Sequence, residues 1–370
     1  MCDLRNQKVI AFYIGSLAKG GAERVVVNLA EYFYQIGYRV YVVTKLRETE
    51  EYEISDGILR VIADLTEEEV SENRLQNFFG RVKKLQNIWK EIRPDVIVSF
   101  IKKNNFMALA SAKPLKIPVI VSVRSAPERE YAGKVYAALV RIMFAFADGI
   151  VLQTKDAMKY FPRYIRKKSV ILPNSLNPAF IRPRFTGERR KEIVTVGRID
   201  TNKNQKMLVE AFLDIAKDYP EWTCILYGDG EGKDAIAHCI KEHSEGASVI
   251  LAGRQDRIQD KIYESSVFVL PSYCEGMPNA LIEAMALGLA AISTDCPCGG
   301  PKDLIVDGVN GILIPVGDKE ALKTALRKVM DSAKLREQLG VNAAQLADRL
   351  HPDKVNEMWK TYVESVYCRE

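Results

Sequence analysis

Short apolar runs alternate with helical patterns along the whole chain of 370 residues, and this alternation restricts the possible fold more than any other feature. In the first half the runs predict strands at 9–14, 40–44, 59–63, 96–100, 119–123, 150–153 and 170–172. In the second half they predict strands at 193–196, 224–227, 249–251, 267–270, 291–293 and 312–314. Strands that alternate with helices form parallel sheets with helices on both faces. Two such series predict an α/β protein with two doubly wound, Rossmann-like domains facing across a cleft.

The segment at 173–191 (PNSLNPAFIRPRFTGERRK) separates the two series and shows little periodicity. Its prolines and basic residues are typical of a connection between domains. We therefore place the first domain at 1–178 and the second at 179–352. The stretch at 353–366 carries apolar residues on one helical face, so we expect a C-terminal amphipathic helix that docks on one of the domains.

The composition is that of an ordinary globular protein, with 47% hydrophobic and 27% charged residues. No apolar run approaches the roughly 20 residues that a membrane span needs. The chain starts with a polar tip that leads directly into a strand-like run, unlike a secretory signal. The seven cysteines, from Cys2 to Cys368, are scattered and odd in number. Together these features predict reduced thiols and a cytoplasmic protein.

Positive charge is concentrated in the first half of the chain. The net charge is +5, but residues 1–180 carry 28 Lys and Arg against 19 Asp and Glu, a net of +9. Basic and aromatic residues occur together at 74–93 and 155–168, and each segment can be a helix lying on an anionic membrane surface. The alternative is a packed helix with a solvated basic face. No nucleic-acid partner is expected.

Residues 271–288 (PSYCEGMPNALIEAMALG) predict a strand, a short loop and a helix. The apolar run at 266–270 comes first, and helical spacing then continues from Pro278 until Gly288 ends the helix. The helix start leaves unpaired backbone N–H groups, and its dipole favours a phosphate there. The residues that would present these groups are Asn279, Ala280 and Leu281.

Two carboxylates frame this turn: Glu275 lies in the loop and Glu283 lies two turns into the helix. Carboxylates accept hydrogen bonds from hydroxyl groups, whereas the helix start binds phosphate. An anion site with an acid on each side suits a sugar nucleotide better than a bare nucleotide.

A second phosphate-binding element is predicted at 194–204 (VTVGRIDTNKN), where a strand ends at Gly197. The following loop carries Arg198 and Lys203, which can hold both phosphates of a diphosphate. The alternative is a solvated loop with two ordinary surface charges.

Glycines follow two further predicted strands. Gly20 and Gly21 lie at a helix start in the first half, where a ligand can approach the backbone closely. The spacing is not that of a P-loop, because Gly21 stands where the lysine should be. In YGDGEGK at 227–233, Gly228 fits a ligand-facing glycine loop better than a dinucleotide fingerprint, since Lys233 replaces the third glycine. A plain strand-to-helix turn remains the alternative for the first loop.

Metal and nucleophile signatures are weak. The histidines are His238, His243 and His351, and none belongs to an H-E-x-x-H motif. Cys296 and Cys298 have no partner pair with zinc spacing. No G-x-S-x-G elbow is present. We therefore expect no metal and no cofactor apart from a nucleotide-sugar substrate.

These pieces together resemble the retaining glycosyltransferases of family 4, which have the GT-B fold. The matching segments are GGAER at 20–24, PNSLN at 173–177, the GRID segment with Lys203, YGDGEG at 227–232, the E-x7-E frame, and the stretch 293–318. The resemblance covers nearly the whole chain and is most specific at 193–318. It implies that the second domain binds the nucleotide sugar, that the first holds the acceptor, and that the helix at 353–370 crosses back onto the first domain.

The resemblance also implies roles for single residues. Glu283 would hold the nucleotide ribose, and Glu275 would contact the donor sugar near its reacting end. Arg198 and Lys203 would neutralise the leaving diphosphate without a metal. The expected catalytic set is Glu275, Arg198 and Lys203. The expected donor-binding set is Gly20, Gly21, Gly228, Gly276, Met277, Asn279, Ala280, Leu281 and Glu283.

The chain departs from the family pattern after the strand at 119–123. Many members have a histidine there, whereas this chain reads SVRSAPERE and places Arg124 in its stead. Arginine cannot act as a general base at neutral pH. Arg124 can instead hold a phosphate or a sugar hydroxyl of the acceptor.

The resemblance, together with these motifs, thus implies a metal-independent, retaining transferase. It would move a hexosyl or N-acetylhexosaminyl unit from a nucleotide-diphosphate sugar, by family frequency a UDP-sugar, to an acceptor hydroxyl. A lipid-linked sugar at the inner face of the cell membrane, in surface polysaccharide biosynthesis, is the expected acceptor. The alternatives are a GT-B sugar-nucleotide epimerase, which needs no acceptor, and a non-catalytic partner that binds a sugar nucleotide without turnover.

Overall fold

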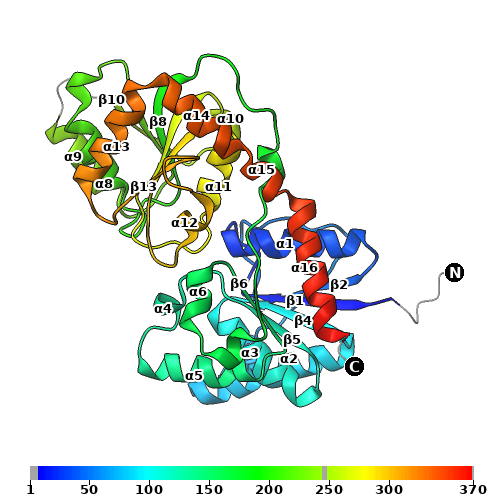
Figure 1. Cartoon of the computed structure of the whole chain (residues 1–370). Helices are drawn as coiled ribbons and strands as arrows, with labels where there is room; N and C mark the ends of the chain where they lie inside the picture. The colour runs from blue at the N-terminus through cyan, green and yellow to red at the C-terminus, as the bar shows by residue number, and fades with distance from the viewer. Residues whose placement is uncertain (1–6, 244–247, 369–370) are drawn as a thin grey trace. The chain divides into compact units, whose positions relative to one another are not determined.

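Two parallel β-sheets, each covered by helices on both faces, organise the chain (Figure 1). The structure is a computed structural model that describes residues 7–243 and 248–368. The chain divides into a first unit of residues 1–173 and 353–370 and a second unit of residues 174–352. Each unit is described by itself.

The first sheet has the strand order β3-β2-β1-β4-β5-β6-β7, and every neighbouring pair is parallel. Its strands are β1 (Val9–Ile14), β2 (Arg39–Thr44), β3 (Leu59–Ile62), β4 (Val96–Phe100), β5 (Val119–Ser122), β6 (Gly149–Leu152) and β7 (Ser169–Ile171). The central strands are buried on both faces, which explains why they read as continuous apolar runs.

The helices of the first unit lie on both faces of this sheet. They are α1 (Gly21–Gln35), α2 (Arg74–Ile92), α3 (Lys102–Ala112), α4 (Pro127–Glu130), α5 (Lys134–Ala145), α6 (Lys155–Tyr160), α7 (Arg163–Arg166) and α16 (Pro352–Tyr367). One face is covered by α1, through Val26 and Phe33, and by α16. On the other face the Trp89 indole N–H of α2 donates to Ser111 Oγ of α3 at 2.9 Å, which fixes these two helices together.

The terminal helix α16 packs on the first unit. Trp359 stacks on Phe100 with ring centroids 5.9 Å apart, and Val355 and Val363 join the same core. The Tyr362 hydroxyl donates to the Lys168 carbonyl at 2.6 Å and accepts from the Ile150 N–H at 2.8 Å. The C-terminal segment is therefore an integral layer of the first unit. Residues 369–370 of the predicted segment lie outside the described residues, as does Cys2.

The second sheet has the order β10-β9-β8-β11-β12-β13, again parallel throughout. Its strands are β8 (Arg190–Val196), β9 (Thr223–Tyr227), β10 (Ser248–Gly253), β11 (Ser265–Leu270), β12 (Ala290–Thr294) and β13 (Ile312–Ile314). The helices are α8 (Gln205–Leu213), α9 (Lys233–Glu242), α10 (Ile258–Ile262), α11 (Asn279–Ala286), α12 (Gly300–Leu304), α13 (Lys319–Asp331), α14 (Ala333–Ala344) and α15 (Leu346–Arg349).

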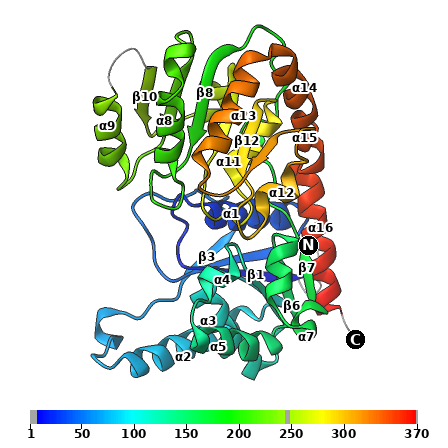
Figure 2. The ribbon, with the colours of Figure 1, turned by 60° about the vertical axis from the view of Figure 1, so that its left-hand side comes forward.

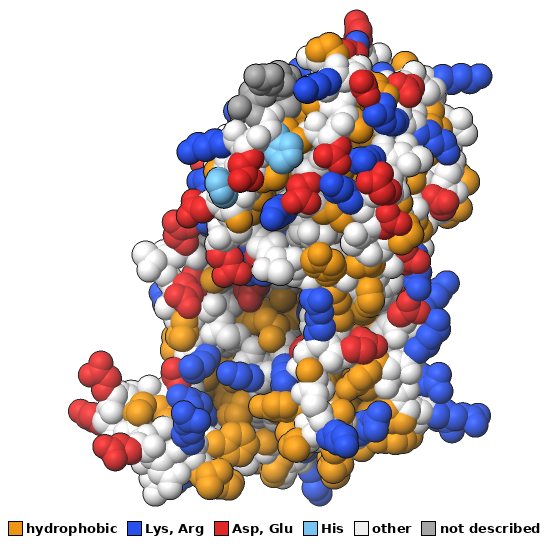
Figure 3. All heavy atoms as spheres, turned by 90° about the vertical axis from the view of Figure 1, so that its left-hand side faces the viewer, with side chains coloured by type: hydrophobic (Ala, Val, Ile, Leu, Met, Phe, Trp, Pro, Cys, Tyr) orange, Lys and Arg blue, Asp and Glu red, His pale blue; other side chains and the backbone are white. Residues whose placement is uncertain are grey.

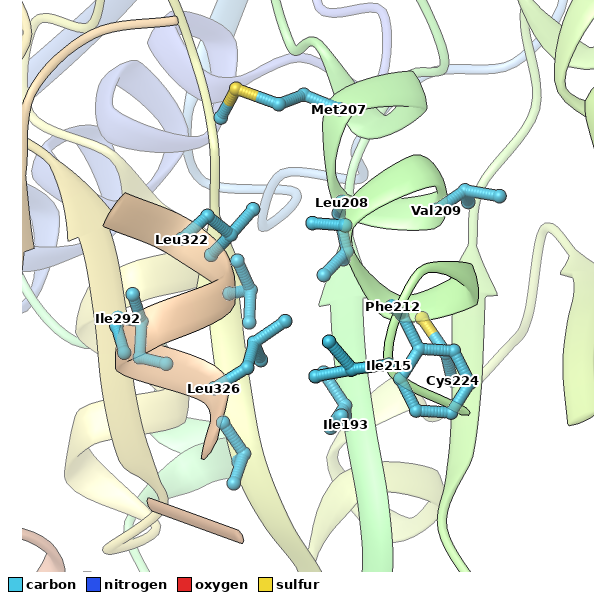
Figure 4. Close-up of a cluster of buried hydrophobic side chains, with 14 of the residues drawn as sticks. Ile193, Met207, Leu208, Val209, Phe212, Ile215, Cys224, Ile292, Leu322 and Leu326 are labelled. Atoms are coloured by element: carbon cyan, nitrogen blue, oxygen red, sulfur yellow. The ribbon is translucent and has the colours of Figure 1, made fainter. Parts of the chain in front are cut away.

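Successive strand residues of the second sheet enter two different cores, as the period of two requires. Ile193 belongs to the core under α8 and α13, together with Leu208 and Leu322 (Figure 4). Val194 belongs to the core on the other face, under α11. Figure 2 shows α8 and α13 beside each other in the second unit. Both faces of this sheet are thus covered, and ligands of such sheets bind at the carboxyl ends of the strands.

Two predicted segments differ from the structure. Residues 174–191 of the predicted connection belong to the second unit, because Leu176 and Phe180 are buried in its core and the Leu176 N–H donates to the Leu350 carbonyl at 2.8 Å. The division therefore lies between residues 173 and 174 and not after residue 178.

The basic segment at 155–168 is not one helix. It forms α6 and α7, and the break lies where Pro162 caps the second of them. The segment at 74–93 is one helix, α2, as predicted. Among residues 7–243 and 248–368, no helix is long and apolar enough to cross a membrane.

Candidate active site

The loops that follow β8 and β9 approach each other so closely that they need glycine. Gly228 follows β9 with φ +146°, and its N–H donates to the Gly253 carbonyl. A Cβ atom on Gly228 would collide with the carbonyl oxygen of Gly197, which follows β8. The predicted glycine loop therefore packs against the start of the segment that carries Arg198 and Lys203.

The structure brings the predicted cation and the predicted acid into direct contact. Lys203 Nζ donates to Glu275 Oε1 at 2.7 Å, although the two residues are 72 positions apart in the chain. The Lys203 side chain is 23% exposed and that of Glu275 is 11% exposed. This pair is thus largely shielded from water, at the carboxyl ends of β8 and β11.

Asp200 links the two predicted cations. Its carboxylate accepts from Arg198 Nε at 2.6 Å and from the Lys203 backbone N–H at 2.8 Å. Burial alone would raise the pKa of Asp200, but these two hydrogen bonds outweigh it and lower the pKa below 3.8. Arg198 is 76% exposed in its side chain and turns toward solvent beyond this contact.

Backbone contacts fix the loop that carries Glu275. The Tyr273 N–H donates to the Asn202 carbonyl at 2.8 Å, and the Asn202 amide donates to the Cys274 carbonyl at 3.0 Å. The Glu275 N–H donates to the Pro297 carbonyl at 2.8 Å. Glu275 is therefore held between the loops that follow β8, β11 and β12.

The helix α11 begins at Asn279, as the sequence predicts, and Gly288 with φ +76° follows its end. Pro278 is the residue before the first turn, and no side chain caps the N–H groups there. Asn174 holds this turn from the side, because its amide donates to the Met277 carbonyl at 3.0 Å and to Asn279 Oδ1 at 2.8 Å. The first turn of α11 therefore retains backbone donors for an anion.

The remaining predicted donor-binding residues occupy different environments. Glu283 is 7% exposed within α11, while Leu281 is fully buried and can offer only its backbone. Gly276 packs against Gly300, where a Cβ would collide with the Gly276 carbonyl. Met277 is buried in the core under α11, and Ala280 packs against the same core.

Three predicted residues belong to the first unit. Gly20 precedes α1 and Gly21 is its first residue, so the predicted strand, glycine turn and helix are present. Arg124 follows β5 and lies 5.9 Å from the centre of the Phe100 ring. Burial lowers the pKa of the Arg124 guanidinium to about 9, so it still carries its charge at neutral pH.

Sequence reasoning missed Asp200, Asn202 and Asn174 as positioning residues. Asp200 and Asn202 lie between Arg198 and Lys203. Their polar side chains, between two residues predicted to bind phosphate, were the sequence signal for a positioning role. In residues 7–243 and 248–368, no group of three or more His, Cys, Asp or Glu is placed to hold a metal ion. Within the part of the chain that the structure describes, none of the cysteines from Cys224 to Cys368 forms a disulfide.

Two parallel-sheet, Rossmann-like units with these strand-end loops define a protein with the GT-B fold. Residues 178–346 match the family "Glycosyl transferases group 1", and residues 19–180 match "Glycosyltransferase Family 4". The chain belongs to family 4 of the glycosyltransferases.

Two bacterial glycosyltransferases are similar to nearly the whole chain. The chain is 27% identical, over 96% of its length and 98% of the relative, to the GalNAc-alpha-(1->4)-GalNAc-alpha-(1->3)-diNAcBac-PP-undecaprenol alpha-1,4-N-acetyl-D-galactosaminyltransferase of Campylobacter jejuni. It is 23% identical, over 95% of its length and 98% of the relative, to the amylovoran biosynthesis glycosyltransferase AmsD of Erwinia amylovora.

Solved structures share the fold. Sucrose-phosphate synthase of Thermosynechococcus elongatus has a TM-score of 0.80 at 18% identity, covering 98% of this chain and 100% of that one. HepE of Anabaena, in complex with UDP and glucose, has a TM-score of 0.79 at 15% identity, covering 97% and 100%.

Proposed function

We propose that this glycosyltransferase moves a hexosyl or N-acetylhexosaminyl unit from a UDP-sugar to a hydroxyl group of a lipid-linked sugar, with retention of configuration. The acceptor class is supported by the Campylobacter relatives, whose names specify undecaprenol-diphosphate-linked sugars. The UDP-sugar is supported by HepE, a protein of the same fold that binds UDP and glucose. The product would enter surface polysaccharide biosynthesis, as the name of the amylovoran enzyme suggests for its own chain.

The observation that carries this proposal is the Lys203–Glu275 contact beside the uncapped start of α11. As the glycosidic bond of the donor breaks, negative charge grows on the diphosphate and positive charge grows on the sugar ring. Lys203, Arg198 and the first backbone N–H groups of α11 would stabilise the diphosphate. Glu275 would lie beside the reacting end of the sugar and balance its charge.

The other donor contacts follow from the same placement. Glu283, buried within α11, would accept hydrogen bonds from the ribose hydroxyls. The loop at Gly228 would approach the nucleotide through its backbone, and Gly20 and Gly21 at the start of α1 are further proposed donor contacts. Because two cations and a helix start supply the positive charge, the proposed reaction requires no metal ion.

The attacking hydroxyl group of the acceptor must transfer its proton to another group. Arg124 remains protonated at neutral pH and cannot accept it. In the proposed reaction the leaving diphosphate oxygen takes the proton of the attacking hydroxyl, while Arg124 holds a phosphate or hydroxyl of the acceptor. The bond from the sugar to the diphosphate breaks, and the bond from the sugar to the acceptor oxygen forms on the same face.

A lipid-linked acceptor requires that the protein reach the membrane. The first unit is basic and exposes large apolar side chains on two of its helices, including Leu75 and Phe79 on α2 and Val135 and Ile142 on α5. Such a surface favours peripheral binding to an anionic bilayer, here the inner face of the cell membrane.

The test is a panel of UDP-, GDP- and ADP-sugars, measured first by thermal shift, because a ligand of the folded state raises Tm. The donor that binds is then incubated with an undecaprenyl-diphosphate-linked sugar, and the anomeric configuration of the product is determined by NMR. We expect a UDP-sugar to bind and the product to retain the donor configuration. Release of UDP without an acceptor would indicate an epimerase, and binding without turnover would indicate a non-catalytic partner.

A further inference from the structure

The first unit contains a pocket of about 440 Å³ at the carboxyl ends of β1 to β4. Its walls come from the carboxyl ends of these strands, from α2 and α3, and from the start of α5. All of its lining belongs to the first unit, so its existence does not depend on the second. We call it the α2–α3 pocket, after the two helices that contribute most of its wall.

Five cationic side chains line the α2–α3 pocket. They are Lys45, Arg74, Arg81, Lys102 and Lys103. Two acids accompany them: Asp64 pairs with Lys45 at 3.6 Å and with Arg81 at 3.1 Å, and Glu130 lies near Lys102. Within the described residues, neither Arg74 nor Lys103 forms an ion pair. The pocket therefore holds three positive charges in excess of its acids.

The walls of the pocket are aromatic and aliphatic as well as cationic. Phe78 and Leu85 contribute from α2, and Phe106 contributes from α3. Lys102 Nζ lies 3.4 Å from the centre of the Tyr136 ring, which comes from α5. A cation held against an aromatic face in an apolar wall is poorly hydrated, so an anion that binds it gains more than it would in water.

Two of the helices that line the pocket, α2 and α5, expose apolar side chains to solvent. On α2, Leu75 is 68% exposed and Phe79 is 66% exposed. On α5, Val135 is 79% exposed and Ile142 is 61% exposed, and Leu139 lies between them on the same helical face. Figure 3 shows apolar and basic side chains interspersed on the surface of the first unit. An apolar chain attached to an anion in the pocket could therefore continue along these helices.

We propose that the α2–α3 pocket binds the diphosphate of the lipid-linked acceptor, with the first part of the lipid chain against α2 and α5. Each phosphate of a diphosphate diester carries one negative charge, and three excess cations match two such groups. The pocket shares no residue with the proposed donor diphosphate site, whose cations belong to the second unit. This inference rests on the proposed acceptor class but not on the identity of the donor.

Farnesyl diphosphate serves as the probe, and binding is measured by isothermal titration calorimetry on the full chain with saturating UDP present. The UDP fills the donor site, so binding of the probe reports another site. We expect farnesyl diphosphate to bind at least about tenfold more tightly than inorganic diphosphate, because only the former carries an apolar chain. A separate titration with UDP alone shows whether the donor half of the proposed function holds.

The pocket variant is Arg74→Gln with Lys103→Gln. Neither side chain has an acidic partner in the described residues, so their removal leaves no carboxylate unpaired. The matched control is Lys83→Gln with Lys90→Gln, which removes the same charge from exposed positions of α2 outside the pocket. We expect the pocket variant to weaken farnesyl diphosphate binding at least about tenfold and the control to change it less than about twofold. UDP binding stays unchanged in both.

Three outcomes would overturn the proposal. In the first, the probe fails to bind once UDP is present, so its only site is the donor site. In the second, pocket and control variants weaken binding equally, so overall charge and not the pocket attracts the diphosphate. In the third, the pocket variant loses binding to phosphatidylglycerol vesicles as strongly as binding to the probe, which would assign the pocket to bulk anionic headgroups.

Discussion

Arg198 and Lys203 in the second unit each contact an acid of that unit, whereas Arg74 and Lys103 in the α2–α3 pocket form no ion pair within the described residues. The paired cations are held at fixed positions before any ligand binds. The unpaired cations keep their charge available for an anion. The comparison suggests that the second unit is built for precise positioning of a reacting group, and the first for capture of a charged lipid.

The largest expected effect comes from breaking the paired arrangement. Lys203→Ala leaves the Glu275 carboxylate largely buried without its cation, so we expect the free energy of unfolding to fall by about 2 kcal/mol. Turnover with a competent UDP-sugar should fall at least about 100-fold, because the leaving diphosphate loses a cation that stabilises its negative charge. Urea unfolding and a radiolabel transfer assay measure the two effects.

Lys191→Ala is the matched control for this variant. Lys191 also pairs with a glutamate, Glu221 at 3.2 Å, but both side chains are 49% exposed. An exposed pair of this kind contributes less than about 1 kcal/mol. Equal losses of activity in the two variants would show that the Lys203–Glu275 contact has no special place in the reaction.

A second prediction compares two glycines at strand ends, one in each sheet. Gly228 follows β9 with a positive φ, and a Cβ there would meet the Gly197 carbonyl. Gly15 follows β1, and a Cβ there would lie 3.9 Å from Asn104 Nδ2, an ordinary contact. We expect Gly228→Ala to lower the free energy of unfolding by about 2–4 kcal/mol and to weaken UDP binding.

Gly15→Ala should change the free energy of unfolding by less than about 0.5 kcal/mol. Thermal unfolding with and without UDP measures both variants. If Gly15→Ala lowers the free energy of unfolding as much as Gly228→Ala does, the close contact between the β8 and β9 loops does not make the second unit more sensitive to a Cβ atom.

The strands of both sheets could be predicted from the sequence because they are buried on two faces and read as apolar runs. The predicted ranges 9–14, 96–100 and 312–314 match β1, β4 and β13, while the other strands differ by up to three residues at their ends. The donor-site loops could be predicted for a related reason. Arg198 and Lys203 are five positions apart in one loop, and Glu275 and Glu283 belong to one strand-to-helix turn.

The α2–α3 pocket could not be predicted, because no short segment contains it. Lys45 follows β2 and Lys102 follows β4, and only the strand order β3-β2-β1-β4 brings these two ends to the same edge of the sheet. The helix α2 then adds Arg74 from a part of the chain between them. The residues of this pocket are far apart in the sequence, whereas the residues within each donor-site loop are close together in it.

A third prediction concerns the exposed apolar residues, which would distinguish the membrane-facing unit. Val135→Ser with Ile142→Ser removes two such residues from α5, and Val341→Ser removes one from α14 in the second unit, where it is 42% exposed. We expect the α5 variant to bind vesicles of phosphatidylglycerol and phosphatidylcholine about tenfold more weakly, since each buried side chain contributes about 1.5–3 kcal/mol at most. Vesicle flotation measures the binding. If Val341→Ser weakens vesicle binding equally, the membrane-binding surface cannot be assigned to the first unit.

The smallest expected effect is a pH dependence of the first unit. Glu51 accepts from Arg60 Nη2 at 2.9 Å, and this hydrogen bond lowers the pKa of Glu51 to about 2. A depressed pKa stabilises the fold above the unfolded value of about 4.5, and this contribution is lost as the pH falls from there toward 2. We expect about 1 kcal/mol of this loss between pH 5 and pH 3, after screening by solvent.

Glu51→Gln should lower the free energy of unfolding at pH 7 and flatten its dependence on pH in this range. Urea unfolding at pH 7, 5 and 3 measures both. Asp200 in the second unit also has a lowered pKa, so the second unit has a pH dependence of its own. A spectroscopic probe in each unit separates the two. In Glu51→Gln, the free energy of unfolding should depend less on pH for the first unit and equally on pH for the second. An unchanged slope for the first unit would show that Glu51 titrates normally and that its contact with Arg60 is not a source of stability.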